Sequence, residues 1–401
     1  MDKYTWHLVQ LAKQSNKDLA NANQDIESPI RAWGRELIKS VSPPLDPKAP
    51  DDPGVQKQYV FRKFLYISIT SLLCIAQDYK RNEKVVFKFC LPPAPDKQVK
   101  PKQKKKAKFI KAREYVMNVY KDKIARYRPH KNEDTERFRR GIQIQHQLHK
   151  KLKQKGLTEL YVPEIYEWKD GTVGERHRLY CVMEFINGIP LIDWCKDRTD
   201  REVIEILYLI AKGLENIVHR FSVVHSDIKP ANILVLNNRP VLLDFGISRL
   251  YQSQAANLTS PTTTGLGTPA YSSAEQLENP IARSFKDDIF ALGRTFWAMW
   301  SREEPDLSDI IVEVDSEGRE KYCEETTQEA LRAKFPASIF PPEEREIFER
   351  AHHIDPGQRY SDISEMRRDI ELLKLKKYRV DNNNFPQIAE IIGELIKIWS
   401  N

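Results

Sequence analysis

The sequence His225-Ser226-Asp227-Ile228-Lys229-Pro230-Ala231-Asn232-Ile233-Leu234 is followed, after a short segment, by Asp244-Phe245-Gly246. Around it, Val223-Val224, Ile233–Leu236 and Val241–Leu243 are typical of short buried strands, with Asn237–Pro240 as the turn between the last two. Such a hairpin would bring Asn232 and Asp244 to the same end. The stretch therefore predicts a loop that gathers two carboxylates, a lysine and an asparagine.

These four side chains have the chemistry that phosphoryl transfer requires. A γ-phosphate must be held in line with a hydroxyl while metal ions neutralise the charge that develops. Asp227 would accept or orient the proton of the attacking hydroxyl, and Lys229 would lie against the transferring phosphoryl group. Asn232 and Asp244 would each hold a Mg²⁺ ion, because this hard cation prefers oxygen ligands. The predicted cofactors are ATP and Mg²⁺.

The two motifs, in this order, resemble the catalytic loop and metal-binding motif of protein kinases, a system that serves as a general template for phosphoryl transfer. Three later segments resemble further motifs of that family: Gly267–Leu277 (GTPAYMAPEQL, altered at Ser272, Ser273 and Ala274), Asp287–Gly293 (the start of the long central helix) and Asp355–Arg359 (DPxxR). The resemblance implies that Asp288 braces the catalytic loop and that Arg359 pairs with Glu275.

The resemblance implies an α+β, two-lobed protein-kinase-like fold, with a small β-rich N-lobe that has one main helix and a large helical C-lobe. Within the family, a lysine two positions after the catalytic acid marks serine/threonine kinases, and Lys229 occupies that position. A serine/threonine protein kinase acting on protein substrates is therefore expected. A small-molecule kinase of similar fold is disfavoured by the Gly267–Leu277 and Asp288–Gly293 motifs.

The nucleotide lobe is expected to contain a strand, a turn and a second strand at Leu72–Tyr79, Lys80–Lys84 and Val85–Pro92. This pattern resembles that of bacterial-type kinases and makes Lys88 the lysine that grips the α- and β-phosphates; an edge-strand lysine is the plainer interpretation. A competing segment, Tyr115–Tyr120, would put Asn118 in that position. Lys88 is preferred because apolar residues from Phe109 to Tyr120 recur at helical spacing.

Leu179–Gly188 is an apolar strand that runs into a turn, and it resembles the hinge between kinase lobes. The resemblance implies that Met183 lies behind the adenine. The backbone of Glu184 and Ile186 would then form the adenine's hydrogen-bonding edge. An ordinary core strand is the alternative, and both descriptions are compatible.

Three features depart from the family pattern. The segment expected to form the glycine-rich phosphate loop, Leu65–Ser71, contains no glycine, although glycines let backbone N–H groups approach phosphates closely. The helix Arg137–Leu148 has Gly141 where the glutamate that pairs with the lysine belongs, and Gln145 or Glu114 are the candidate replacements.

The third departure is Ser226, which replaces the arginine that usually precedes the catalytic acid. Because that arginine normally pairs with a phosphorylated residue, its absence argues against phosphate-dependent ordering of the activation segment. The segment between Gly246 and Gly267 still carries many hydroxyls, typical of a solvated loop or of a regulated site: Ser248, Thr259, Ser260, Thr262, Thr263 and Thr264.

Length and composition agree with a large globular domain. The chain has 401 residues, enough for a catalytic domain of about 250 to 300 residues plus extensions. No run reaches the roughly 18 apolar residues that a membrane span needs, and the N-terminus lacks the plan of a signal peptide. A cytoplasmic location is expected. The cysteines lack metal-ligand spacing and are expected to be reduced core thiols: Cys74, Cys90, Cys181, Cys195 and Cys323.

The expected organisation is a helical N-terminal extension (1–41), a proline-rich linker (42–57), the kinase-like domain (58–375) with a basic insertion at about 93–136, and a helical tail (376–401). The basic run of residues 97–113 supplies more than the formal net charge of +7. It is a solvated loop, a site for nucleic acid or an anionic surface, or a recruiter of an acidic partner.

Two functional hypotheses follow. The first is an active kinase, since Asp227, Lys229, Asn232, Asp244 and Lys88 are all present. The second is a pseudokinase, a nucleotide-binding or scaffolding module whose losses cluster in the nucleotide lobe.

Overall fold

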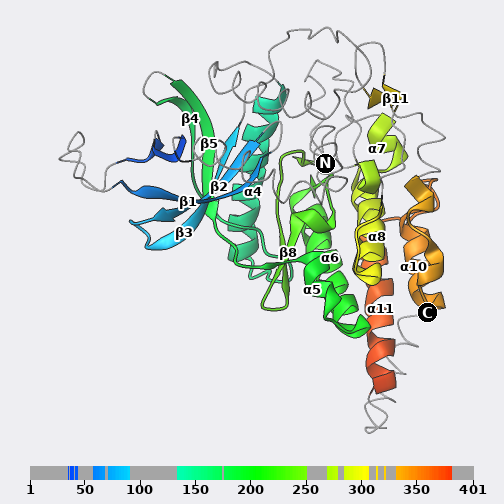
Figure 1. The fold of residues 1–401 in the computed structure, drawn as a ribbon. Helices are drawn as coiled ribbons and strands as arrows, with labels where there is room; N and C mark the ends of the chain where they lie inside the picture. Colours follow the sequence, from blue (N-terminus) through cyan, green and yellow to red (C-terminus); the bar gives the residue numbers. More distant parts are fainter. Residues whose placement is uncertain are drawn as a thin grey trace, which may run out of the picture. The chain divides into compact units, whose positions relative to one another are not determined.

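The computed structural model describes residues 35, 37–39, 41–43, 57–67, 71–90, 133–173, 176–250, 269–278, 284–306, 313–314, 320–321 and 331–381. These residues fall into two compact units, one within 2–142 and 164–185, the other within 143–163 and 186–401. The first unit is rich in strands and the second in helices (Figure 1). The α+β fold with a strand-rich N-lobe and a helical C-lobe is therefore confirmed.

The N-terminal unit is built on a five-stranded antiparallel sheet in the order β1-β2-β3-β5-β4. Its strands are β1 (Tyr59–Ile67), β2 (Ser71–Asp78), β3 (Glu83–Cys90), β4 (Ile165–Val173) and β5 (Arg176–Glu184). The β2–β3 hairpin lies where the sequence predicted it, and Asn82 takes a left-handed φ of 57° in its turn. Lys88 is paired with Leu73 of β2 and Cys181 of β5, so it lies on the central strand.

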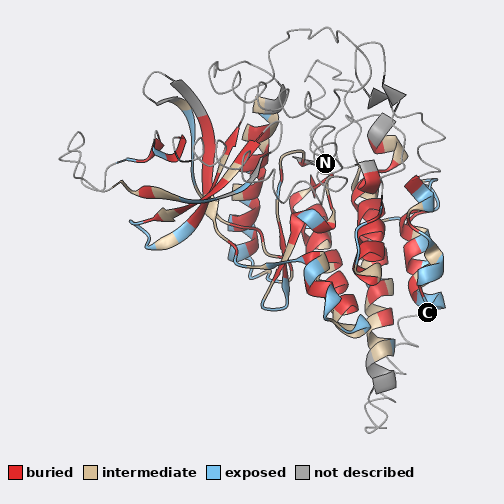
Figure 2. Ribbon diagram, viewed as in Figure 1, coloured by how far each residue is buried: buried red, intermediate tan, exposed pale blue. Residues whose placement is uncertain are grey.

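The central strands of this sheet are largely buried (Figure 2), with buried clusters on both faces. On one face, Phe138 and Ile142 of α4 (Glu133–Gln154) pack with Cys90 and Cys181 of the sheet. Alternation along β3 directs Phe87 and Phe89 to the opposite face. There Phe87 stacks on Tyr180 with ring centroids 5.8 Å apart, and Phe89 packs against the same ring in a tilted arrangement at 5.6 Å.

The aromatic face is covered by residues that precede the sheet in the chain. Leu37, Ile38 and Val41 are buried in the same cluster as Phe87. Ser42 Oγ accepts a hydrogen bond of 2.7 Å from the backbone N–H of Tyr59. Part of the segment expected to be an N-terminal extension therefore belongs to the core of this unit. Residues 44–56 of the expected linker and most of the basic insertion lie outside the described residues, and α4 begins at Glu133 inside the range expected for the insertion.

The C-terminal unit packs helices around a large apolar core that includes Leu207, Phe296 and Ile370. Its longer helices are α6 (Asp200–Phe221), α8 (Phe285–Ser301), α10 (Pro342–Ala351) and α11 (Ile363–Asp381). Shorter elements are β6 (Ile189–Pro190), α5 (Leu191–Lys196), β7 (Val223–Val224), η1 (Pro230–Asn232), β8 (Ile233–Leu236), β9 (Arg239–Leu242), β10 (Arg249–Leu250), η2 (Pro269–Tyr271), α7 (Ala274–Glu278), β11 (Glu313–Val314), β12 (Glu320–Lys321) and η3 (Ala337–Ile339).

Capping boxes set the starts of the two most buried helices. Thr199 caps α6 and Ser284 caps α8, and each pairs reciprocally with the acid three residues on, Glu202 and Asp287. Helix α11 continues past the tail boundary expected at residue 376, and the rest of that tail lies outside the described residues.

The β8–β9 hairpin follows the prediction with one correction. Asn237 and Asn238 alone form the turn, with φ of 51° and 56°, as a two-residue turn with both central residues left-handed requires. Arg239 and Pro240, expected in the turn, belong to β9. The Leu243 N–H donates to the Asn232 carbonyl at 2.8 Å. Asn232 and Asp244 therefore come to the same end of the hairpin, as predicted.

Candidate active site

The loop between β7 and β8 is anchored by a carboxylate from α8. Asp288, 2% exposed, accepts hydrogen bonds from the backbone N–H groups of His225 at 2.8 Å and Ser226 at 2.7 Å. Ser226 has a φ of 68°, and a left-handed residue lets successive N–H groups converge on one acceptor. The predicted bracing of the catalytic loop by Asp288 is confirmed.

Asp227 is held by two side chains from its own loop. Its Oδ2 atom accepts from Lys229 Nζ at 2.7 Å and from Asn232 Nδ2 at 2.8 Å, and Nδ2 also donates to the Asp227 carbonyl at 2.9 Å. Burial alone would raise the pKa of Asp227, but the Lys229 ammonium outweighs it and the pKa lies below its usual range. The carboxylate is therefore ionised at neutral pH and able to accept a hydrogen bond from a hydroxyl.

His225 connects the catalytic loop to the segment that carries Asp244. Its Nε2 atom lies 3.1 Å from the Leu243 carbonyl, and Nδ1 lies 3.3 Å from the Asp227 N–H. Its ring meets Phe245 edge to face at 4.9 Å between centroids. Burial lowers the pKa of His225, and a carbonyl on one side with an N–H on the other fits the neutral ring with its proton on Nε2. The sequence predicts no role for His225, although this residue lies only two positions before the predicted acid.

The groups expected to bind Mg²⁺ fit that cation by their chemistry. The two hydrogen bonds from Asn232 Nδ2 make its Oδ1 the atom that would face a metal. Asp244 is exposed, with φ at 59°, and its Oδ1 accepts from the Gly246 N–H at 3.1 Å. Among the described residues, no three His, Cys, Asp or Glu side chains form a metal-binding group. The site would therefore offer one amide oxygen and one carboxylate, and the phosphate oxygens would complete the shell.

The residues expected to bind nucleotide include several in the strand-rich unit. Lys88 Nζ lies 5.9 Å from the centre of the Phe138 ring of α4, within the range of a cation–π contact. Met183 packs against the cluster that contains Phe138. The Glu184 N–H donates to the Glu164 carbonyl at 2.9 Å. Ile186 is buried at the start of the helical unit.

The partner of Lys88 stays a prediction. Gly141 lies on α4 as expected, and it is buried. The Gln145 amide donates through Nε2 to the Pro163 carbonyl at 3.0 Å. Glu114, the other candidate replacement, and Asn118, the competing position for the lysine, lie outside the described residues.

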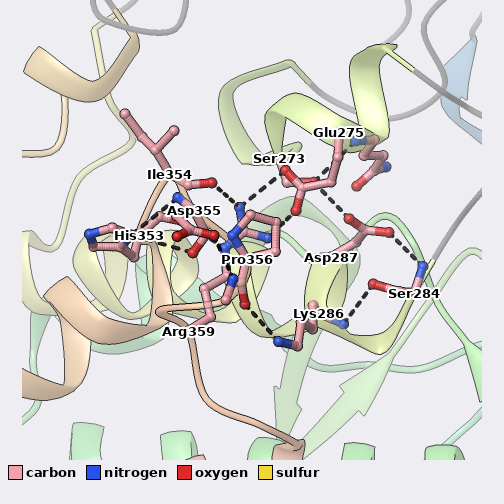
Figure 3. Close-up of polar contacts among 12 residues, drawn as sticks. Ser273, Glu275, Ser284, Lys286, Asp287, His353, Ile354, Asp355, Pro356 and Arg359 are labelled. Carbon is pink, nitrogen blue, oxygen red and sulfur yellow. Dashed lines mark hydrogen bonds and ion pairs between the residues drawn. The ribbon is translucent and has the colours of Figure 1, made fainter.

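Glu275 and Arg359 form an ion pair whose guanidinium group is buried (Figure 3). Arg359 donates to both carboxylate oxygens of Glu275, and its side chain is 0% exposed. It also donates to the carbonyls of His353 at 2.6 Å and Ile354 at 2.9 Å. The predicted Arg359–Glu275 pair is confirmed. It anchors α7 to the loop that precedes α11.

Two polar residues in this region have roles that the sequence analysis missed. Ser273 donates from Oγ to Asp287 at 2.7 Å and accepts from the Gln276 N–H at 3.2 Å, so this altered position caps α7 (Figure 3). Ser248, expected among the hydroxyls of a loop, is 1% exposed and donates to the His225 carbonyl at 3.0 Å. Serine at either place has no sequence signal of its own, because the acceptor comes from a distant segment.

A strand-rich unit with a lysine on its central strand, joined in sequence to a helical unit with a braced Asp-Lys-Asn loop, defines the class of protein-kinase-like folds. Residues 111–369 match the protein kinase domain. The chain belongs to the protein kinase family. The matched range begins after β3, so it does not include Lys88.

Relatives of known name are bacterial serine/threonine kinases. PknB of Mycolicibacterium smegmatis is 28% identical over 197 residues, which are 48% of this chain and 30% of that protein. PknA of Corynebacterium glutamicum is 30% identical over 224 residues, 54% of this chain and 44% of that protein. The chain thus spans less than half the length of these relatives. The PknI kinase domain of Mycobacterium tuberculosis aligns with a TM-score of 0.45 at 17% identity, covering 78% of this chain and 95% of that domain. None of the described helices is long and apolar enough to span a membrane.

Proposed function

We propose that the chain is an active serine/threonine protein kinase, which transfers the γ-phosphate of ATP to Ser or Thr hydroxyls of proteins with the help of Mg²⁺. The observation that carries the proposal is that Asp227 Oδ2 accepts two hydrogen bonds, from Lys229 Nζ at 2.7 Å and from Asn232 Nδ2 at 2.8 Å. The lysine at position 229 and the names of the relatives, PknB and PknA, support Ser and Thr as acceptors.

In this proposal the loop prepares the hydroxyl and the chain holds the nucleotide. Ionised Asp227 accepts or orients the hydroxyl proton, and the Lys229 ammonium keeps that carboxylate charged. Asn232 Oδ1 and Asp244 hold the cation. Bound Mg²⁺–ATP supplies the phosphoryl group and neutralises its developing charge.

In the proposal, residues of the hinge and of the strand-rich unit bind the nucleotide. Lys88 grips the α- and β-phosphates, Met183 lies behind the adenine, and the backbone of Glu184 and Ile186 bonds its edge. The central position of Lys88 in the sheet and its apolar neighbours support this assignment.

A nucleotide-binding pseudokinase is the second candidate. It is favoured by Gly141 in place of the helix glutamate and by the absence of glycine from Leu65–Ser71. Each weakened phosphate contact costs on the order of 1 to 3 kcal/mol, the scale of hydrogen bonds to charged groups.

The test is ATP- and Mg²⁺-dependent phosphate transfer by the purified chain, to itself and to a generic basic protein. Transfer that Asp227→Asn abolishes establishes the kinase, and mapping of the labelled residues tests Ser and Thr as acceptors. Absent transfer, combined with an ATP-induced rise in melting temperature that Asp244→Asn removes, establishes the pseudokinase instead.

A further inference from the structure

The Ser226–Asp227 peptide group is held by a side chain from a segment 50 residues away in the chain. Gln276 of α7 donates from Nε2 to the Ser226 carbonyl at 2.8 Å. Gln276 is 1% exposed and Ser226 is 3% exposed, so water does not compete at this contact. The carbonyl that Gln276 holds belongs to the residue directly before the proposed catalytic acid.

The backbone at Ser226 needs external restraint. A left-handed conformation costs a side-chain-bearing residue roughly 1 to 2 kcal/mol relative to the right-handed one, and Ser226 has a φ of 68°. Its own hydroxyl gives no support, since Ser226 Oγ is buried without a hydrogen-bond partner among the described residues. The loop geometry that directs Asp227 is therefore imposed by neighbouring elements.

Hydrogen bonds connect the loop to α8, α8 to α7, and α7 back to the loop. Asp288 binds the N–H groups of His225 and Ser226, and the adjacent Asp287 accepts from Ser273 at 2.7 Å. Ser273 caps α7, which carries Gln276 back to the Ser226 carbonyl. Both N–H groups and both carbonyls of residues 225 and 226 have partners, because Ser248 Oγ donates to the His225 carbonyl at 3.0 Å.

We infer that Gln276 is a positioning residue for phosphoryl transfer: its amide N–H holds the Ser226 carbonyl and so fixes the direction of the Asp227 side chain. This inference rests on the proposed kinase function. The loop has Ser226 in place of an arginine that would take a phosphate from the activation segment. Gln276 supplies an uncharged restraint from α7 that needs no phosphorylation. The helix that carries Gln276, α7, is anchored, because the fully buried side chain of Arg359 binds the neighbouring Glu275.

The test compares Gln276→Glu with the wild-type full-length chain. Glutamate has the same shape, but when ionised it accepts hydrogen bonds and cannot donate to a carbonyl. At pH 8 we expect kcat to fall roughly tenfold to a hundredfold, as displacement of a positioned catalytic group does. KM for ATP is expected to change less than about threefold, since the group that Gln276 holds is the Ser226 carbonyl, which is not among the proposed nucleotide-binding groups. Gln276→Asn, which keeps the amide, serves if the glutamate variant fails to fold, and its shorter reach predicts the same loss.

A pH profile separates positioning from general destabilisation. The introduced carboxyl group, once protonated, would regain an O–H donor, so the ratio of variant to wild-type kcat should rise several-fold as the pH falls from 8 to 6. Burial, together with the carboxylates of Asp287 and Asp288 on α8, of Asp227 on the loop and of Glu275 on α7, favours the protonated form, whereas Arg359 opposes it.

Tyr208→Phe is the matched control. It removes one hydrogen bond of 3.1 Å, to Glu371, in the same unit and away from the loop. We expect a lower melting temperature with unchanged kcat. A kcat for Gln276→Glu no lower than that of Tyr208→Phe, or a constant ratio across the pH range, overturns the inference.

Amide hydrogen exchange of the peptide 222–233 tests the hold on the loop without an activity assay. We expect faster exchange in Gln276→Glu than in either the wild type or Tyr208→Phe. If the wild type transfers no phosphate, the kinase proposal fails and this exchange decides the role of Gln276: faster exchange supports the hold on the loop, and equal exchange overturns it.

Discussion

Lys229 Nζ lies 2.7 Å from Asp227 Oδ2, and both side chains are largely shielded, with exposed fractions of 12% and 14%. Only one residue, Ile228, separates them in the chain, so the contact forms within one loop. In this setting the pKa of Asp227 lies below its usual range, and the Lys229 pKa lies above it despite burial, because each charge stabilises the other. The proposed catalytic acid is therefore kept ionised at neutral pH, and its carboxylate can accept a hydrogen bond from a hydroxyl.

The first prediction concerns stability at acid pH. Because the pKa of Asp227 is lower in the folded chain than its unfolded value of about 3.9, the folded state binds fewer protons. The contribution of the Asp227 carboxylate to the free energy of unfolding is therefore present above about pH 4 and is lost as the pH falls further. In Asp227→Asn, the free energy of unfolding should fall less between pH 5 and pH 3. A pKa lowered by one corresponds to about 1.4 kcal/mol.

Urea unfolding at several pH values measures this difference. His225 also has a lowered pKa, from burial, and its contribution is lost as the pH falls below about 6.5. That higher window is common to both proteins. Parallel curves for wild type and variant below pH 5 would show that Asp227 is not stabilised in its charged form.

The second prediction tests Lys88 against Asn118. Lys88→Met should lower kcat/KM for ATP by roughly 10- to 100-fold, because a hydrogen bond to a charged group contributes about 1.5 to 3 kcal/mol. Asn118→Ala should change it less than about twofold. Initial rates over a range of ATP concentrations measure both. The reverse order of effects would assign the phosphate-binding position to the 115–120 segment.

The third prediction concerns the buried guanidinium. Arg359→Met should lower the free energy of unfolding by about 1 to 3 kcal/mol, since it removes the buried donor of several hydrogen bonds, whereas Glu275, 32% exposed, stays accessible to water. The His353 and Ile354 carbonyls also lose their donor. Glu275→Gln keeps one acceptor oxygen for Arg359 and both of its backbone contacts, and should cost less. Urea unfolding of both variants checks the order, and a smaller loss in Arg359→Met would contradict it.

The fourth prediction concerns the residues that cover the sheet. Ile38 is 1% exposed, so Ile38→Ala should cost about 2 to 5 kcal/mol, the usual range for removing a buried aliphatic side chain. Lys39, exposed on the same helical segment, is the matched control, and Lys39→Ala should stay within about 0.5 kcal/mol. The rate of amide hydrogen exchange in the peptide 83–90 measures how far each substitution destabilises β3. Equal exchange in both variants would mean that this segment does not support the sheet.

The fifth prediction concerns close packing in α6. A Cβ atom at Gly213 would overlap the Cβ atom of Leu160, so Gly213→Ala should cost about 1 to 3 kcal/mol although alanine favours helices. Adding Leu160→Ala should not rescue it, because that change keeps the Cβ. Gly171→Ala, with no atom within 4 Å of the new Cβ, is the control. Thermal unfolding compares the three variants, and full rescue by Leu160→Ala would place the clash further along the leucine side chain.

Local patterns predicted much of the fold and part of the site. The β2–β3 and β8–β9 hairpins, the start of α8 and the order of the motifs follow from short runs of residues. The Asp227, Lys229 and Asn232 contacts lie within six residues of one loop, and spacing alone brings such groups together. Because proline is typical of turns, the sequence predicts a turn that extends through Pro240, whereas only Asn237 and Asn238 form it and Pro240 lies in the strand β9.

Contacts between distant segments could not be predicted in the same way. Gln276 bonds a carbonyl 50 residues away, Ser273 bonds Asp287, and Leu37 and Ile38 cover the aromatic face of the sheet. A buried backbone carbonyl accepts a hydrogen bond from any donor that the fold brings to it. The residue type at position 276 therefore does not predict the contact.

The sequence by itself determined the type of chemistry and the elements that carry it, because catalytic groups and strand or helix patterns are encoded by neighbours in the chain. The tertiary structure alone decided how the loop is held: which carboxylate binds its N–H groups, which amide binds the Ser226 carbonyl, and which side chains bury the sheet. Burial removes water as a competing partner, and only the folded arrangement specifies which protein group takes its place.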